Sequence, residues 1–283
     1  MPGRDPSIVL IVVWFGPLPL WMPAFLVSCR RNPDVEWLIF TDAASPPRLP
    51  PNVRIVPMDA DALNRRCAAA LGFETHISAS LPYKVCDLRP TFGLVFAQEI
   101  GPRDFWGHCD LDVVWGDIRA FMRPEILEGH DIVTSRIGRI SGHFCLYRNR
   151  PEWKTLFREI PGVTSLAQDA EHRNIDEMQM TELLRSHQAS RGARSLRRWA
   201  TRQALPRVYW HATLTTSGAN QRLLLADPSL SYRWRDGKTF DAGGTEMMYL
   251  HFHQLHRTMT TIDFGYEDAP GAFRLEPAGI FTG

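Results

Sequence analysis

The 283-residue sequence carries almost no net charge, since 32 lysine and arginine residues balance 31 aspartate and glutamate residues. It lacks the excess of positive charge with which nucleic-acid-binding proteins attract their ligand, so we expect no nucleic-acid partner. Lysine is scarce as well. Only Lys84, Lys154 and Lys238 are present, and the positive charge therefore comes overwhelmingly from arginine.

Cysteines at metal-binding or redox spacing are also absent. The five cysteines are scattered singly, and no two of them form a C-x-x-C motif. An odd number at such positions argues against a disulfide framework and against a zinc site, and favours reduced thiols in a cytoplasmic protein. The five are Cys29, Cys67, Cys86, Cys109 and Cys145.

An uninterrupted apolar run of membrane-spanning length is missing too. The strongest candidate for a signal peptide or a membrane anchor is the apolar segment 7–29, but it contains Pro17, Pro19 and Pro23. These prolines would break a spanning helix. We instead expect a buried strand over residues 8–14, then a turn, and then a helix that begins with proline.

The order of the apolar runs predicts a single α/β domain. Residues 35–40 (VEWLIF) and 53–56 (VRIV) follow the first strand and its helix, which is a βαβ opening. We therefore expect the sheet to begin with parallel strands. Ligands bind beyond the carboxyl ends of the strands in such sheets. Trp14, Phe15 and Asp42 occupy strand ends and are expected to line one crevice.

The stretch Phe105–Ile118, FWGHCDLDVVWGDI, sets Asp110 and Asp112 at the end of an apolar strand. Side chains at i and i+2 of an extended segment share a face, so both carboxylates would point at one place. Two like charges persist there if they are solvated, share a proton or face a cation. A divalent ion completed by substrate phosphates suits this ligand set. A structural pair at a solvated rim is the alternative.

Four segments, taken in order, resemble the successive motifs of a bacterial group of glycosyltransferases. These are metal-dependent enzymes of the GT-A fold, associated with surface-polysaccharide and lipopolysaccharide gene clusters. The resemblance implies a mixed central sheet flanked by helices, with a Rossmann-like nucleotide-sugar-binding half over about 7–115 and an acceptor-binding half over about 116–283. The four segments are PYKVCDLRPTFG (82–93), FWGHCDLDVVWGDI (105–118), GHFCLYRN (142–149) and YLHFHQLHRTM (249–259).

The resemblance implies transfer of a sugar from a nucleoside-diphosphate sugar to a bacterial glycan or lipid-linked acceptor. Asp110 and Asp112 would bind Mn²⁺ or Mg²⁺ and the donor diphosphate, with Asp110 also near the ribose. Enzymes of this fold usually take a further metal ligand from near the C-terminus, and alignment on Tyr-Leu-His-Phe favours His251. His253 and His256 lie close by in the sequence. The alternative is that these histidines pack or form hydrogen bonds at the surface.

Further donor contacts follow from the same resemblance. Tyr83, Lys84 and Asp87 belong to the segment that would lie against the donor. Lys84 would pair with phosphate, and Asp87 would accept from a sugar hydroxyl or from Lys84. A pair of these two on a helix surface is the alternative. Asp42 resembles the residue that meets the nucleoside.

The roles expected for three further residues are less specific. Trp14 and Phe15 would either stack near the base or pack in the core. His143, in the GHF turn, is a candidate for contact with donor or acceptor.

A carboxylate near neutrality could take the proton of the acceptor hydroxyl in an inverting reaction. The candidates lie in one short acidic segment and are Asp169, Asp176 and Glu177.

The segment 185–207 is rich in arginine and also supplies Leu196, Trp199 and Leu205 as an apolar side. A solvated helical face is one interpretation. The other is peripheral contact with an anionic membrane, or with the pyrophosphate of a lipid-linked acceptor, at the inner face of the cell membrane.

Two other functions compete with glycosyl transfer. A phosphatase or phosphotransferase would use the first aspartate of D-L-D-V as nucleophile, but that strand normally opens its fold and here follows three others. A non-catalytic sugar-binding or calcium-binding module would leave the PYKVCD and GHFCLYRN segments without a role.

Overall fold

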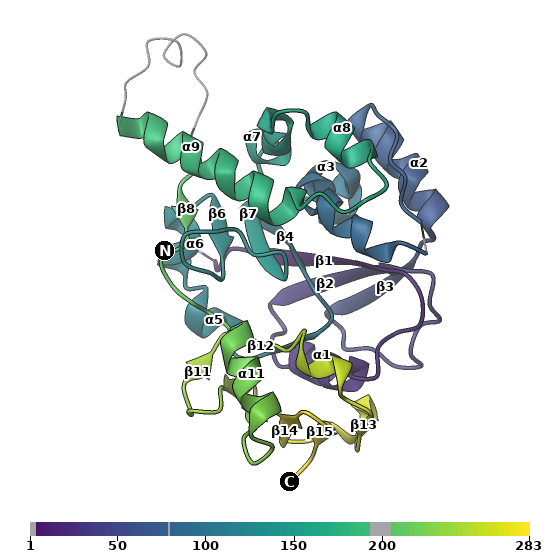
Figure 1. Ribbon diagram of the computed structural model, residues 1–283, viewed down its shortest axis with the longest axis vertical. Coiled ribbons are helices and arrows are strands. Elements are labelled where there is room, and N and C mark those ends of the chain that lie inside the picture. Colours follow the sequence, from purple (N-terminus) through teal and green to yellow (C-terminus); the bar gives the residue numbers. More distant parts are fainter. Residues whose placement is uncertain (1–3, 79, 193–204) are drawn as a thin grey trace.

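The computed structural model describes residues 4–78, 80–192 and 205–283. Its centre is a seven-stranded sheet in the order β3-β2-β1-β4-β7-β6-β8 (Figure 1). The predicted α/β class, with a mixed central sheet flanked by helices, is confirmed. The strands are β1 (Ile8–Trp14), β2 (Val35–Thr41), β3 (Val53–Pro57), β4 (Phe105–Cys109), β6 (Ile132–Thr134), β7 (Phe144–Arg148) and β8 (Val208–Tyr209).

The first half of the sheet is parallel, as the βαβ pattern predicts. β1 pairs in parallel with β2 on one side and with β4 on the other, and β3 extends beyond β2. The first five residues of β1, IVLIV, are buried. Each such side chain contributes roughly 1.5–3 kcal/mol to folding. The strand order reverses at β1, and this leaves a crevice beyond the carboxyl ends of β1 and β4.

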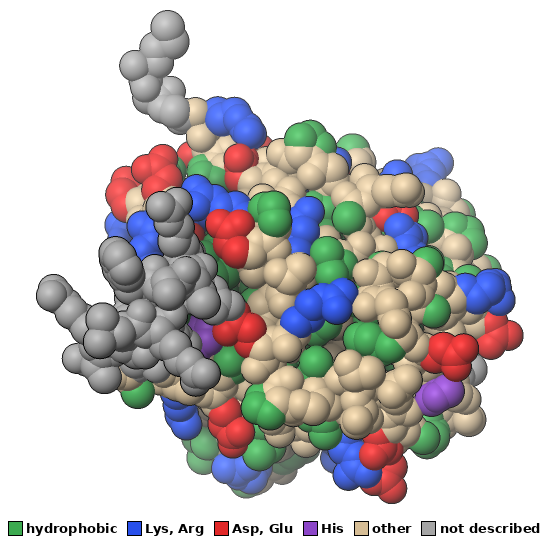
Figure 2. Space-filling view, turned by 90° about the horizontal axis from the view of Figure 1, so that it is seen from above, with side chains coloured by type: hydrophobic (Ala, Val, Ile, Leu, Met, Phe, Trp, Pro, Cys, Tyr) green, Lys and Arg blue, Asp and Glu red, His purple; other side chains and the backbone are tan. Residues whose placement is uncertain are grey.

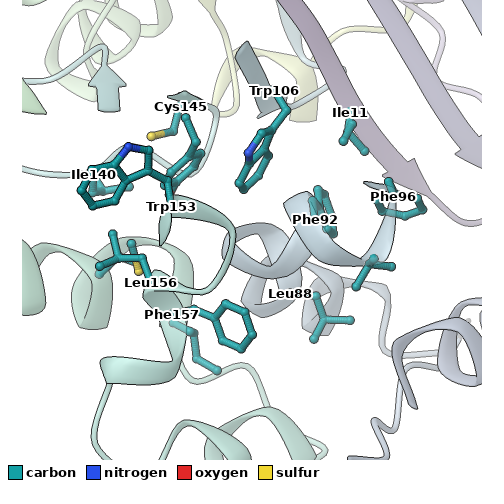
Figure 3. Close-up of a cluster of buried hydrophobic side chains, with 14 of the residues drawn as sticks. Ile11, Leu88, Phe92, Phe96, Trp106, Ile140, Cys145, Trp153, Leu156 and Phe157 are labelled. Carbon is teal, nitrogen blue, oxygen red and sulfur yellow. The ribbon is translucent and has the colours of Figure 1, made fainter. Parts of the chain in front are cut away.

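One face of the sheet is covered by the helical segments between β3 and β4 and those that follow β7 (Figure 1). Figure 3 shows part of this core, where Phe92 and Phe96 lie near Trp106. The segments are α2 (Ala60–Leu71), η1 (Pro82–Thr91), α3 (Phe92–Val95), α4 (Ala97–Ile100), α7 (Pro151–Lys154), η2 (Leu156–Glu159), α8 (Val163–Gln168), η3 (Ile175–Gln179) and α9 (Met180–Gly192).

The opposite face packs on α1 (Met22–Arg30), α5 (Ile118–Phe121) and α6 (Pro124–Gly129). α1 begins with Pro23 in its first turn, as predicted. In the part of the chain that the structure describes, no helix combines the length and the apolarity needed to cross a bilayer.

The C-terminal part forms a second sheet in the order β11-β10-β9-β14-β15-β13. Two further strands, β5 (Val113–Trp115) and β12 (Tyr249–His251), form a separate two-stranded sheet. They join the two large sheets. The remaining elements are α11 (Gly218–Ala226), β9 (Tyr232–Arg235), β10 (Lys238–Phe240), β11 (Glu246–Met247), η4 (Leu255–Arg257), β13 (Thr261–Ile262), η5 (Tyr266–Asp268), β14 (Ala272–Glu276) and β15 (Gly279–Phe281).

Basic and acidic side chains alternate over the face seen in Figure 2, in keeping with the balanced composition. All five cysteines are free, as predicted. Most of the arginine-rich segment expected to contact a membrane, including Leu196 and Trp199, lies outside the described residues.

We expect Gly107→Ala to destabilise the protein strongly. A Cβ at this position of β4 would lie 2.3 Å from the Cys145 carbonyl oxygen of the neighbouring strand, so the pairing of β4 with β7 would have to open. The loss should be about 3 kcal/mol or more. Gly129→Ala is the control, because nothing lies within 4 Å of its Cβ position. Urea denaturation measures both, and equal stability of the two variants would contradict the packing described.

Candidate functional site

A cavity of about 670 Å³ lies at the crevice beyond β1 and β4. Its wall includes Trp14 and Phe15 from the end of β1, and Asp110 and Asp112 from the segment that follows β4. Loops from the second half of the chain close the other side. The residues predicted to meet at the carboxyl ends of the parallel strands therefore do share one cavity, with the exception of Asp42.

The D-L-D segment is a bend between two strands, and the expectation of one extended segment is wrong. β4 ends at Cys109, and the chain turns over Asp110 and Asp112 before β5 begins at Val113. The reason is that the chain leaves the central sheet here, because β5 pairs with β12 instead. Both aspartates nevertheless line the cavity.

The pairing of β5 with β12 brings a histidine to this bend. In the antiparallel register Val113 lies opposite His251, so the histidine comes beside Asp112, with its Nε2 atom 3.6 Å from Asp112 Oδ1. The Phe252 N–H donates to the Asp112 carbonyl at 3.1 Å and extends the pairing. One ligand atom each from Asp110, Asp112 and His251 lies within 4.8 Å of the others.

The His251 side chain is the best test of whether a cation fits here. It is only 7% exposed, yet neither ring nitrogen has a hydrogen-bond partner in the described structure. A buried imidazole without partners is costly unless another group occupies its lone pair. Two carboxylates and one imidazole suit Mn²⁺, and the residues present therefore fit a divalent cation.

The two aspartates have different electrostatic surroundings. Burial raises the pKa of the Asp110 carboxyl to about 6, against the opposing effect of Arg89. Burial also acts to raise the pKa of Asp112, but the neighbouring imidazoles of His251 and His256 hold it well below its usual range. Asp112 is therefore the more firmly ionised of the pair, and a bound cation would favour the charged form of both.

Arg89 supplies a counter-charge that the sequence interpretation missed. Its guanidinium bridges two carboxylates, since one nitrogen donates to Asp110 and the other donates to Asp176 Oδ2 at 2.9 Å. Arg89 lies in η1, within the PYKVCDLRPTFG segment. The sequence did contain a signal for such a residue, because two neighbouring buried aspartates, Asp110 and Asp112, require a positive group nearby.

Trp21 and His256 form hydrogen bonds to the D-L-D bend and hold it in place. His256 Nδ1 donates to Asp112 Oδ2 at 3.1 Å, and its ring stacks on Trp21 with centroids 4.8 Å apart. The Trp21 indole N–H in turn donates to the Leu111 carbonyl at 2.9 Å. The bend and its second aspartate are therefore fixed by two residues that are far apart in the sequence.

His143 lines the cavity, but both of its ring nitrogens have partners within the protein. The Arg136 Nε–H donates to His143 Nε2 at 3.1 Å, so the ring proton lies on Nδ1, 2.7 Å from the Tyr249 hydroxyl. That hydroxyl donates to Ser135 Oγ. Burial lowers the pKa of His143 well below its usual range, and so do His251 and Arg136. The ring stacks on His251 at 3.9 Å and offers no free nitrogen to a substrate.

Lys84 and Asp87 do not line the cavity. Lys84 is 1% exposed, and its ammonium donates to Asp87 Oδ2 and to the carbonyls of Leu166 and Glu171, at 2.8 to 2.9 Å. These three bonds use all of its protons, so none is left for a phosphate. In the structure Asp87 accepts a hydrogen bond from Lys84, which was one of the two roles expected for it. The pair is buried and does not lie on a helix surface.

A second group of potential metal ligands consists of Asp87, His172 and Asp176, whose ligand atoms lie within 4.8 Å of one another. Its two carboxylates already pair with Lys84 and Arg89. Lys84 pairs with Asp87, and Arg89 is shared between Asp176 and Asp110, so the carboxylates of this group already have cationic partners within the protein. We regard it as a buried ion network that supports Arg89.

The three candidates for the acceptor base lie in different surroundings. Asp176 and Glu177 line the cavity and lie in the π-helical turn η3, which follows Asn174 in the left-handed conformation with a φ of 54°. Asp169 lies outside the cavity and pairs with Arg173 on the surface. The structure therefore brings two of the three to the site.

Of the other residues expected to contact the sugar-nucleotide donor, three line the cavity and one does not. Trp14, Phe15 and Tyr83 line it, and Tyr83 is 71% exposed with its ring edge-to-face against His172. Asp42 is exposed and does not line the cavity. Its carboxylate accepts the Gly16 N–H at 2.7 Å and so supports the loop after β1.

Comparison with solved structures finds chains whose backbone fold is partly similar to that of this protein. The galactosyltransferase LgtC, in complex with donor and acceptor sugar analogues, has a TM-score of 0.43 and 11% identity over 92% of this chain and 100% of its own. An active-site mutant of LgtC has a TM-score of 0.44 and 12% identity over 92% and 94%. Mouse xyloside xylosyltransferase 1 in its apo form has a TM-score of 0.37 and 9% identity over 87% and 97%.

Likeness at these scores carries no conclusion about activity. None of the curated proteins matches this chain. A family model does match residues 10–281, which is nearly the whole sequence; its description is a family of unknown function. The chain belongs to the DUF6625 family.

Proposed function

We propose that this protein is a metal-dependent glycosyltransferase, which moves a sugar from a nucleoside-diphosphate sugar to a glycan or lipid-linked acceptor. One observation carries the proposal: Asp110, Asp112 and His251 converge within 4.8 Å at the wall of a large cavity beyond the parallel strands. Such an edge of an α/β sheet is where nucleotides bind. The resemblance of the four sequence segments to GT-A glycosyltransferases supports the same activity.

The chemistry requires stabilisation of a leaving group. Breaking the bond between the sugar and the diphosphate leaves negative charge on the phosphate oxygens. A divalent ion, Mn²⁺ or Mg²⁺, held by Asp110, Asp112 and His251 would act as a Lewis acid toward that charge. Arg89 holds Asp110 in place, and His256 holds Asp112. Ligands fixed in this way bind a cation without having to reorganise.

The nucleoside would bind near the end of β1. The half-buried Trp14 gives this end of the cavity an aromatic wall on which a base can stack, whereas Phe15 is 7% exposed and packs in the core. Trp14 is oriented by its indole N–H, which donates to the Pro17 carbonyl at 2.9 Å.

Glu177 is the proposed base for an inverting transfer. Although burial acts to raise the pKa of Asp176, the nearby His172 ring and the charge of Arg89 lower it, so Asp176 is a poor proton acceptor. Glu177 accepts the Gly142 N–H at 2.7 Å, and this bond orients its carboxylate. The acceptor hydroxyl would pass its proton to Glu177 as its oxygen forms the new bond to the sugar.

Thermal-shift measurements with nucleoside diphosphates test this function. We expect one nucleotide to stabilise the wild type only when Mn²⁺ is present, by about 2.7 kcal/mol at a hundred times the dissociation constant. Asp112→Asn keeps the shape of the side chain but removes its charge, so it should lose this stabilisation and keep its fold. Cation-independent stabilisation, or an unchanged response in Asp112→Asn, would contradict the metal-dependent mechanism.

Variants of His256 test how Asp112 is positioned. His256→Phe keeps a ring against Trp21 but loses the donor to Asp112, so Mn²⁺ affinity should fall by about 10-fold to 100-fold. His256→Asn keeps a donor at a similar place and should retain most of the affinity. Electron paramagnetic resonance of free Mn²⁺ gives the dissociation constants, and equal affinity in the Phe variant and the wild type would argue against this role.

A further inference from the structure

Two arginines in one tight turn line the cavity. Arg136 and Arg139 form an antiparallel bridge across residues 136–139, and Gly138 takes the positive φ of 69° that the turn requires. Residues directly opposite each other in such a bridge project their side chains to the same side. Both arginines contribute to the cavity wall.

These two cations lack a salt bridge within the described residues, although the charge of Glu177 in the same cavity acts to raise the pKa of Arg136. In residues 4–78, 80–192 and 205–283, no carboxylate forms an ion pair with Arg136 or Arg139. Arg136 is half-buried, and burial lowers its pKa, as does the charge of Arg139. Like charges held together in this way favour an anion between them, just as the paired aspartates favour a cation.

The turn is held in place before any ligand arrives. Its backbone is fixed on both sides, since Gly138 N–H donates to the Trp210 carbonyl at 2.9 Å and Arg185 donates to the Gly138 carbonyl at 3.0 Å. The Arg136 side chain is oriented by its bond from Nε to His143. That bond leaves the four terminal N–H groups of the guanidinium for a planar or tetrahedral anion.

Along the edge of the sheet, the proposed metal ligands lie between this turn and the end of β1, where the nucleoside is proposed to bind. Adjacent strands follow the order β1, β4, β7, β6, as Figure 1 shows. The carboxyl ends of β1, β4 and β6 and the amino end of β7 lie at the same edge, because β7 is antiparallel to β4 and β6. At about 4.8 Å per strand, Arg136 at the end of β6 lies about 14 Å from the end of β1 and about 10 Å from that of β4.

We propose that Arg136 and Arg139 form an anion-binding subsite for the acceptor, and that the acceptor carries a phosphate or carboxylate group. The inference rests on the proposed function, which assigns the donor diphosphate to the metal ligands after β4. The edge then has three consecutive positions: the nucleoside at β1, the cation and diphosphate at β4, and the anionic acceptor at β6. Bidentate guanidinium bonds suit both phosphate and carboxylate.

Calorimetric titration with inorganic phosphate, in chelator and at low ionic strength, tests the subsite. Wild type should show saturable binding, and Arg139→Ala should weaken it by about tenfold or more, because charge-assisted hydrogen bonds are lost. Arg139 is exposed, so this variant should fold. Arg65→Ala, on the exposed side of α2 and outside the cavity, is the matched control and should bind phosphate like the wild type.

A second titration, with Mn²⁺ and the nucleoside diphosphate that stabilises the wild type most, distinguishes the source of the anion. We expect Arg139→Ala to leave this affinity unchanged. An equal loss of both affinities would assign the arginines to the donor diphosphate and overturn the acceptor assignment. Phosphate binding that is absent from the wild type, or equal in Arg139→Ala, would overturn the subsite. Arginine-dependent phosphate binding without any nucleotide binding would instead refute the glycosyltransferase function, and with it the assignment of the anion to an acceptor.

Discussion

The repulsion between Asp110 and Asp112 is the constraint on which the whole site depends. Two carboxylates at the wall of one cavity are unfavourable unless positive or hydrogen-bond-donating groups surround them. The structure brings such groups from distant parts of the chain. Arg89 comes from the helical segment before β4, and His251 and His256 come from the C-terminal region. The site can therefore form only when β12 pairs with β5.

This dependence links folding to function in a specific way. The short pair of β5 and β12 connects the central sheet to the C-terminal sheet, and its register decides which residue lies beside Asp112. A shift by one residue would turn His251 away from the aspartate, because neighbouring side chains of a strand point to opposite faces. The C-terminal region thus completes the proposed cation site and also covers part of the core.

Much of the parallel half could be predicted from the sequence, because its strands are apolar runs bounded by turns. The structure also brings together Asp110, Asp112 and His251, to which a motif and a resemblance pointed, while their role as metal ligands stays a prediction. The bend in the D-L-D segment could not be foreseen, because it arises when the chain leaves one sheet for another. Short segments carry no information about that change of partner.

The residues that were missed or misplaced depend on tertiary contacts. Asp112 and His256 are 144 positions apart, and no local pattern relates them. Lys84 occurs in a segment that resembles a donor-binding motif, but the carbonyls that bind its ammonium come from α8 and from the loop that follows it. Asp176 lies at the cavity within the π-helical turn η3, whereas Asp169 pairs with Arg173 on the surface, and the local sequence does not distinguish these placements.

Anomalous scattering from crystals soaked with Mn²⁺ and a nucleoside diphosphate tests the central claim most directly. The account predicts one strong manganese peak, bonded to Asp110, Asp112 and His251 and to phosphate oxygens of the nucleotide. A peak at Asp87, His172 and Asp176, or ordered nucleotide with no manganese at the D-L-D bend, would contradict it.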